Sequence, residues 1–133
     1  MTDYIYKLRF KVRDYELDAE GIVNNANYLH YLEHTRHEFC DTNGFSFTAM
    51  REEGIIPVLN KVEIEYKTPL RGNEEFESCL WLERKGVRFI FHQDIFKLTG
   101  EQVVKATVSC VCLVGDKLDR GDALAEIFKD YLK

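Results

Sequence analysis

The first part of the chain combines a short alternating segment with a polar loop. Between residues 4 and 13, apolar side chains alternate with lysine and arginine. A period of two is typical of a half-buried strand. Residues 14–26 then carry acids, a glycine and asparagines, and this composition predicts a loop.

A long helix is predicted directly after this loop. Asn27 is the expected N-cap, because asparagine side chains accept hydrogen bonds from the free N–H groups of a first helical turn. Asn43 and Gly44 mark the expected end, since glycine accepts the left-handed conformation that follows a helix. The buried stripe is expected at Tyr28, Tyr31, Leu32, Thr35 and Phe39.

From residue 56 onward the pattern has a period of two, which predicts a series of strands. The apolar face of the first of these strands is expected at Ile56, Val58, Val62, Ile64 and Tyr66. Three further alternating segments follow, at 74–84, 87–95 and 104–114. Glycines at the two intervening turns predict hairpins. Residues 45–54 are expected to form a short helix or a structured loop, and residues 121–132 a short amphipathic helix.

These elements predict an α+β fold in one domain, residues 1–133. Hairpins produce an antiparallel sheet, and its apolar face requires a cover. Only one long helix is available, so we expect a curved antiparallel sheet wrapped around one central helix. Because one helix covers little sheet, an edge strand should remain open, and a homodimer or homotetramer is the expected assembly.

The composition narrows the possible partners and the compartment. The chain has 18 Lys and Arg against 23 Asp and Glu, a formal net charge of −5, which does not favour nucleic acid or a membrane surface. No apolar stretch is long enough for a membrane helix, and the N-terminus lacks the pattern of a signal or transit peptide. Four cysteines without an export signal predict reduced thiols and a cytoplasmic location.

The candidate chemistry lies in the loop that precedes the long helix. Asp18 stands close in sequence to a helix N-terminus, whose unpaired N–H groups can hold an anion, including one that forms in a transition state. A carboxylate beside such a site suits attack on an acyl carbonyl. The alternative is that Asp18 and the neighbouring asparagines only stabilise turns.

Other polar residues receive structural interpretations first. His30, His34 and His37 recur at helical spacing, but without a general-base glutamate in register, so a polar helix face is preferred over a metal site. No metal and no cofactor are predicted. Cys110 and Cys112 are expected to be small buried residues on one face of the last strand.

The segment from Asp18 to Glu33, D-x-x-G-I-V-N-N-A-N-Y-L-x-Y-L-E, resembles the signature of hotdog-fold acyl-CoA thioesterases of the 4-hydroxybenzoyl-CoA thioesterase-like family. The likeness continues through VEIEYKTPLRGNEEFE, GVRFIFHQDIF and GEQVVKATVSCVCL, and it covers roughly residues 5–115. The resemblance implies a hotdog fold and hydrolysis of an acyl-CoA to the free acid and CoA.

The resemblance also implies roles for single residues. Asp18 falls on the catalytic carboxylate of the family, as nucleophile or general base. Asn25 falls where a backbone N–H polarises the thioester carbonyl, a position at which many bacterial members have histidine. Substrate-binding positions are implied at Gly21, Asn24, Tyr28, Glu33 and Arg88, of which Glu33 is also a second candidate carboxylate and Arg88 a candidate for the CoA phosphates.

Three alternatives to acyl-CoA hydrolysis stay open at this point. The first is hydrolysis of an acyl thioester of acyl carrier protein (ACP) on the same fold. The second is a protein that binds acyl thioesters without catalysis. The third is a dehydratase, which ranks low because that chemistry pairs a histidine with the carboxylate, and no histidine accompanies Asp18 in its loop.

Overall fold

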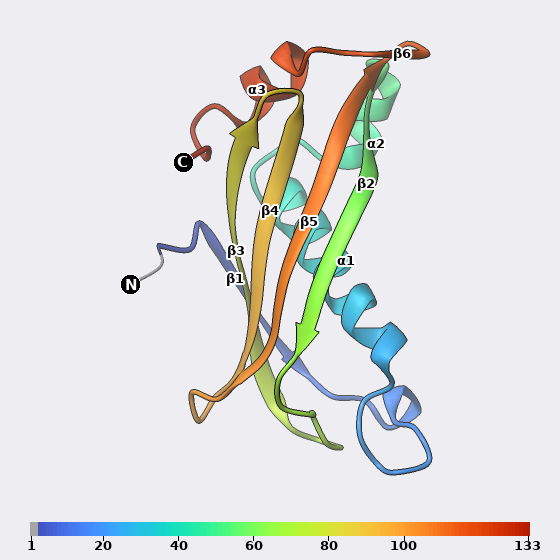
Figure 1. The fold of residues 1–133 in the computed structure, drawn as a ribbon, viewed down its shortest axis with the longest axis vertical. Coiled ribbons are helices and arrows are strands. Elements are labelled where there is room, and N and C mark those ends of the chain that lie inside the picture. The colour runs from blue at the N-terminus through green and yellow to red at the C-terminus, as the bar shows by residue number, and fades with distance from the viewer. Residues whose placement is uncertain (1–2) are drawn as a thin grey trace.

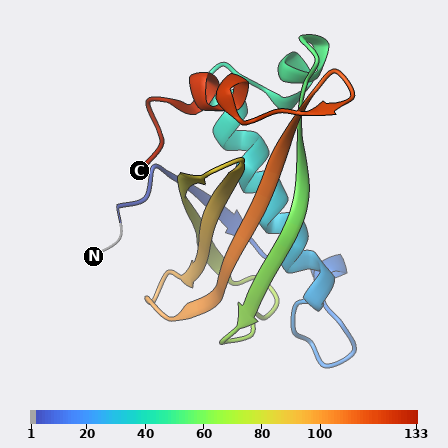
Figure 2. The ribbon, with the colours of Figure 1, turned by 45° about the horizontal axis from the view of Figure 1, so that its top comes forward.

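One face of a curved antiparallel sheet is covered by a single long helix in the computed structural model, which describes residues 3–133 (Figure 1). The sheet is six-stranded, with the order β1-β3-β4-β5-β2 and a short β6 beside β5. Figure 2 shows the sheet curling around helix α1. The predicted architecture is therefore confirmed. The strands are β1 (Tyr6–Lys11), β2 (Ile55–Tyr66), β3 (Glu75–Lys85), β4 (Arg88–Lys97), β5 (Gln102–Val114) and β6 (Lys117–Leu118).

The helices are α1 (Asn25–Thr42), α2 (Phe47–Glu52), α3 (Asp122–Phe128) and the 3₁₀ turn η1 (Asp14–Glu16). The expected N-cap at Asn27 is wrong by three residues. Asn24 is the N-cap, and its side chain accepts a hydrogen bond from the Ala26 N–H at 3.0 Å. Asn27 lies inside the first turn, and its side chain instead donates to the backbone oxygen of Glu16.

The predicted stripe of α1 is buried as expected, and two more residues join it. Arg36 and Cys40 are also buried on this helix. Polar contacts tie α1 to the middle of the sheet: the Gln93 side chain of β4 donates to the backbone oxygen of Leu32, and Thr35 Oγ1 lies 2.8 Å from Ser78 Oγ of β3. Because these groups are buried and paired, they fix the position of the helix on the sheet.

Strand β2 departs from the expected alternation. The pairing with β5 shifts between Leu59 and Lys61, so Asn60 is an extra residue in the strand. Before this bulge, Leu59 lies opposite the buried Cys110, and after it, Val62 lies opposite the buried Val108. Paired residues share a face of the sheet, so Ile56 and Val58 lie on the outer face rather than with Val62.

All four cysteines are free and buried. Cys110 and Cys112 lie on the inner face of β5 as predicted. Burial raises the pKa of the Cys110 thiol to about 12, and it raises that of Cys40 equally. These groups are therefore uncharged components of the core near neutral pH.

Candidate active site

The loop between β1 and α1 is fixed by a buried carboxylate, that of Glu16. This carboxylate accepts hydrogen bonds from the Tyr31 hydroxyl at 2.8 Å and from the Arg13 backbone N–H at 2.7 Å. The Arg13 guanidinium adds an ion pair at 3.2 Å. Burial and the bond to Glu16 both raise the pKa of Tyr31, so this phenol stays protonated as the donor. The sequence analysis missed Glu16, because a lone acid in a polar loop carries no sign of burial.

Glu16 also holds the segment in which the helix begins. Its backbone oxygen accepts hydrogen bonds from the Asn24 N–H and from the Asn27 side chain, each at 2.9 Å. The N-cap residue and the first turn of α1 are thus attached to the loop at one point. Residues 17–23 between these anchors form a loop that is closed by an antiparallel bridge between Leu17 and Val23.

Asp18 stabilises a tight turn within this loop. Its Oδ1 accepts hydrogen bonds from the backbone N–H groups of Glu20 at 2.8 Å and Ile22 at 3.4 Å. Gly21 occupies the tip of the turn with φ of +77°, a conformation that favours glycine. Asp18 therefore does stabilise a turn, as the alternative interpretation of this residue expects. The turn uses only one carboxylate oxygen, and Oδ2 has no hydrogen-bond donor among the residues 3–133.

The N-terminus of α1 presents a free backbone donor next to this turn. Asn25 is the first helical residue, and its N–H has no acceptor in the described part of the chain. The first N–H groups of a helix carry the positive end of its dipole, so this position favours negative charge. The Asn25 side chain is exposed and makes no hydrogen bond in the described structure.

A hollow of about 250 Å³ opens beside the helix start. It is lined by Ile22, Val23, Asn25, Tyr28, Tyr66, Lys67, Thr68 and Pro69. Tyr28 is buried, and its hydroxyl accepts a hydrogen bond from the Leu70 N–H at 3.1 Å. Burial is the main cause that raises the pKa of Tyr28, and the charge of Asp18 adds to it. Asp18 itself does not line this hollow, but its loop neighbours Ile22 and Val23 do.

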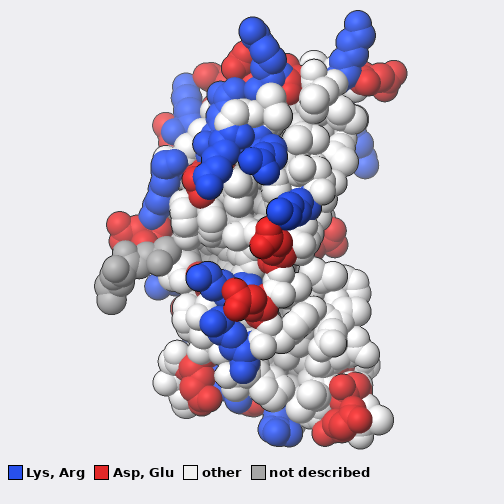
Figure 3. Space-filling model, viewed as in Figure 1, with Lys and Arg blue, Asp and Glu red and all other residues white. Residues whose placement is uncertain are grey.

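The remaining predicted site residues divide between this place and two others. Gly21 and Asn24 lie in the loop and at the helix start, with Asp18 and Asn25. Arg88 begins β4 at the β3–β4 hairpin, which lies at the opposite end of the sheet from the loop (Figure 1). Figure 3 shows Lys and Arg side chains gathered on the outer face near this hairpin. Glu33 lies farther along α1 and borders a different cavity.

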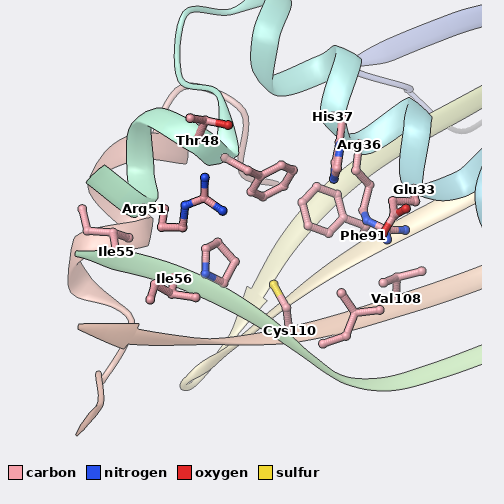
Figure 4. A pocket seen from close by; sticks show the side chains of 13 residues that line it. Glu33, Arg36, His37, Thr48, Arg51, Ile55, Ile56, Phe91, Val108 and Cys110 are labelled. Atoms are coloured by element: carbon pink, nitrogen blue, oxygen red, sulfur yellow. The ribbon is translucent and has the colours of Figure 1, made fainter. Parts of the chain in front are cut away.

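This second cavity has a volume of about 350 Å³ and lies between α1, α2 and the sheet (Figure 4). Its walls are largely apolar, and it is lined by Glu33, Arg36, His37, Phe47, Thr48, Arg51, Ile55, Ile56, Pro57, Leu59, Phe91, Val108 and Cys110. The sequence analysis missed Arg36 here, since an arginine on a helix is ordinarily assigned to the solvent face.

Of the three histidines of α1, His30 and His34 line neither hollow, and His37 lines the second cavity. His34 is within 3.8 Å of Glu38, and the His37 ring packs against Phe47. Between residues 3 and 133, no three His, Cys, Asp or Glu side chains gather as metal ligands would. No helix in the same range combines the length and apolar character needed to cross a membrane.

Comparison with known proteins decides the family. The model of the thioesterase-like superfamily matches residues 12–128. The chain belongs to this superfamily. The predicted family and the predicted class of enzyme, a thioesterase, are thereby confirmed.

Individual relatives cover most of this thioesterase. A protein of Aquifex aeolicus is 35% identical over 128 residues, 96% of this chain and 98% of the relative. The long-chain acyl-CoA thioesterase FadM of Escherichia coli is 32% identical over 107 residues, 79% of this chain and 80% of the relative. The chloroplastic acyl-ACP thioesterase ATL2 of Arabidopsis thaliana is 36% identical over 100 residues, but these cover only 53% of its length.

Solved structures confirm the hotdog architecture of this thioesterase. A hypothetical protein from Aquifex aeolicus superposes with a TM-score of 0.85 at 34% identity, covering 93% of this chain and 97% of that one. YbaW of Escherichia coli gives a TM-score of 0.83 at 29% identity, with 96% and 98% covered. The helix and the curled sheet are therefore common to these proteins.

The N-cap assignment gives a prediction for stability. Asn24→Ala should lower the free energy of unfolding by about 1 kcal/mol, because the Ala26 N–H loses its side-chain acceptor. Asn25→Ala, one residue along, should change it far less, since the Asn25 side chain makes no hydrogen bond in the described structure. Urea unfolding of both variants measures the difference. Equal losses would contradict the assignment.

Proposed function

We propose that this thioesterase hydrolyses an acyl-CoA to the free acid and CoA, and that the reaction takes place beside the start of α1. The observation that carries the proposal is the placement of Asp18. Its carboxylate lies in a turn next to the helix start, and among residues 3–133 one of its oxygens and the first helical N–H have no hydrogen-bond partner. Both groups are available to a substrate without breaking an existing hydrogen bond.

The two groups supply the two requirements of thioester hydrolysis. The carbonyl carbon needs a nucleophile, and the carbonyl oxygen needs stabilisation as it becomes negative. Asp18 acts on the carbon, either directly through Oδ2 or by taking a proton from an attacking water. The Asn25 N–H donates to the oxygen. Collapse of the tetrahedral species breaks the C–S bond, and CoA leaves as a thiolate that takes a proton from the solvent or the general base. When water attacks, this step yields the free acid. When Asp18 attacks directly, the acyl group remains on Asp18 as an anhydride, and a water molecule hydrolyses it to the free acid and restores the carboxylate.

The other predicted residues have supporting roles in this proposal. Gly21 allows the turn that presents Asp18, and Asn24 fixes the first turn of α1. Tyr28 forms a wall of the adjoining hollow, where the acyl group would enter. Arg88 would meet the CoA phosphates together with other basic residues near the β3–β4 hairpin (Figure 3). Within one chain this hairpin is distant from Asp18, so Arg88 would serve the site of a partner subunit.

ACP is the second candidate carrier. Its support is the 36% identity to ATL2, which is named as an acyl-ACP thioesterase. A hydrolysis screen with matched acyl-CoA and acyl-ACP substrates separates the two. Turnover confined to ACP thioesters would replace the first candidate with the second, and binding without turnover would leave a non-catalytic binding protein.

We also propose that the active assembly is a homodimer or a dimer of dimers with sites at the seam. Strand β2 is an edge of the sheet, and a long edge strand offers unpaired N–H and C=O groups to another chain. Apolar side chains along it are exposed: Val58, Leu59, Val62 and Tyr66. Isologous pairing of two β2 strands would cover them and continue the sheet. The four free thiols support a reducing, cytoplasmic location for this assembly.

Asp18→Asn tests the carboxylate. Asparagine keeps an oxygen for the Glu20 and Ile22 N–H groups, so the turn should survive. Turnover should fall by something on the order of 10²–10⁴, the range of acid–base contributions. Glu20→Gln is the matched control, because it removes one charge from the same exposed loop. Steady-state hydrolysis beside circular dichroism measures both, and a folded Asp18→Asn protein with wild-type turnover would reduce Asp18 to a turn former and leave Glu33 as the next candidate.

Asn25→Pro tests the backbone donor. Proline lacks an N–H and is well tolerated at the first position of a helix, and the extended conformation of Asn24 suits a following proline. If the Asn25 N–H holds the oxyanion, kcat should fall by roughly 10²–10³ while the melting temperature changes little. Asn25→Ala retains the N–H and should keep most of the activity. Equal kcat values for the two variants would rule out this donor.

The β2 interface gives a prediction for assembly. Sedimentation at micromolar concentration should show a dimer or tetramer for the wild type. Replacing Val58 and Val62 by lysine should shift the protein toward the monomer, because charges on an edge strand oppose pairing. Val87→Lys, at an equally exposed valine outside this edge, should not. A wild-type monomer that is stable and active would contradict the proposal.

A further inference from the structure

The cavity between α1, α2 and the sheet contains a buried cation that the catalytic proposal does not use. Arg36 is only 6% exposed. Its Nη1 donates to the Gln93 side chain at 2.9 Å, and Gln93 is itself fixed by a hydrogen bond to the backbone of Leu32. The guanidinium is therefore held in one position by groups that are buried with it.

Arg36 has no carboxylate partner in the part of the chain that the structure describes. No Asp or Glu oxygen within residues 3–133 forms an ion pair with it. A guanidinium has five N–H donors, and of the described residues only Gln93 accepts from this one. No side-chain nitrogen in the described chain is both buried and unpaired, so the remaining nitrogens of Arg36 are accessible. Since Arg36 lines the cavity, these nitrogens can donate to a ligand there. Burial lowers the pKa of Arg36 and the nearby charge of Glu33 raises it, but arginine stays charged.

The surroundings of Arg36 fit an apolar chain that ends in an anion. Phe47, Phe91 and Val108 form apolar walls, and Figure 4 shows the Arg36 side chain extending into the cavity between Glu33 and Phe91. Arg51 adds a second positive charge to the lining, against one negative charge from Glu33. A fixed planar guanidinium matches a carboxylate through two parallel hydrogen bonds, and it does so most strongly away from water.

We propose that this cavity binds the far end of the acyl group and that Arg36 selects acyl groups carrying a carboxylate there, the ω-carboxyacyl thioesters. This proposal rests on the proposed function and names its substrate class. Arg36 lies 11 residues beyond Asn25, or roughly 16 Å along α1 at ~1.5 Å per residue. The thioester is held either at the Asp18 site of the same chain, from which a long acyl group reaches the cavity, or at the Asp18 site of a partner subunit. In the second case the partner's loop lies at the β2 side of the cavity.

Hydrolysis of matched substrate pairs tests the selection. Each pair has equal chain length, with and without the terminal carboxylate: adipyl- and hexanoyl-CoA, suberyl- and octanoyl-CoA, and dodecanedioyl- and lauroyl-CoA. The wild type should prefer the carboxylated member of at least one pair by roughly 10- to 100-fold in kcat/KM. Arg36→Met keeps the length of the side chain without its charge, and it should remove that preference while retaining hydrolysis of the neutral member.

Two further variants test whether the preference depends on the guanidinium at this position. Arg36→Lys keeps the charge without the planar fork and should retain only part of the preference. Arg120→Met, which removes an exposed arginine outside the cavity, should leave it unchanged. Thermal unfolding and hydrolysis of the neutral substrates show whether each variant is folded.

Ligand binding without turnover separates this proposal from the catalytic one. Octanoate and octanamide differ in charge but little in shape, and calorimetry should show tighter binding of octanoate to the wild type and equal binding of both to Arg36→Met. If Arg36-dependent octanoate binding is found without hydrolysis of any thioester, the catalytic proposal fails and the anion site stands. The site is overturned if the wild type prefers neither octanoate nor any carboxylated substrate, or if the preference persists in folded Arg36→Met.

Discussion

The packing of α1 against the inner face of the sheet is the constraint on which the other features depend. Among residues 3–133, α1 is the only long helix over the sheet, and each of the two core clusters joins buried strand side chains to side chains of this helix. Apolar burial supplies the attraction but little orientation. The orientation comes from buried polar contacts, those of Thr35 with Ser78 and of Gln93 with Leu32, which hold the helix at one position along the sheet.

A fixed helix also fixes its N-terminus, and with it the candidate active site. Tyr31 belongs to the buried stripe, and its hydroxyl holds the carboxylate of Glu16. The backbone of Glu16 in turn holds Asn24 and Asn27 at the helix start. The core is therefore connected to the loop that carries Asp18 by a continuous set of short hydrogen bonds. The two ends of the loop are also held by apolar packing, since Val23 is buried in the core and Leu17 packs against it.

The β2 edge is where the fold remains open. On the N-terminal side of the extra residue Asn60, Pro57 and Leu59 pair with the buried Cys112 and Cys110 and line the cavity, whereas Val58 lies on the outer face. The same edge exposes several apolar side chains and borders the cavity that contains Arg36. The homodimer proposed above would cover the open edge, the exposed apolar side chains and this side of the cavity together.

The sequence by itself determined the class of the fold, and it indicated a candidate position for the chemistry. Periods of two and of 3.6 residues identified the strands, the long helix and its stripe from Tyr28 to Phe39, because the side that faces the core must be apolar all along an element. The motif around Asp18 and Asn25 indicated the thioesterase family, and comparison confirmed that family.

Tertiary structure alone decided which polar residues are buried and where β1 and β2 pair in the sheet. Glu16 and Arg36 look like surface residues in the sequence, since their partners Tyr31 and Gln93 are 15 and 57 positions away. The bulge at Asn60 is also invisible locally, because it is defined only by the register with β5. Periodicity records the side of an element that meets the core, whereas contacts between distant segments exist only once the chain has folded.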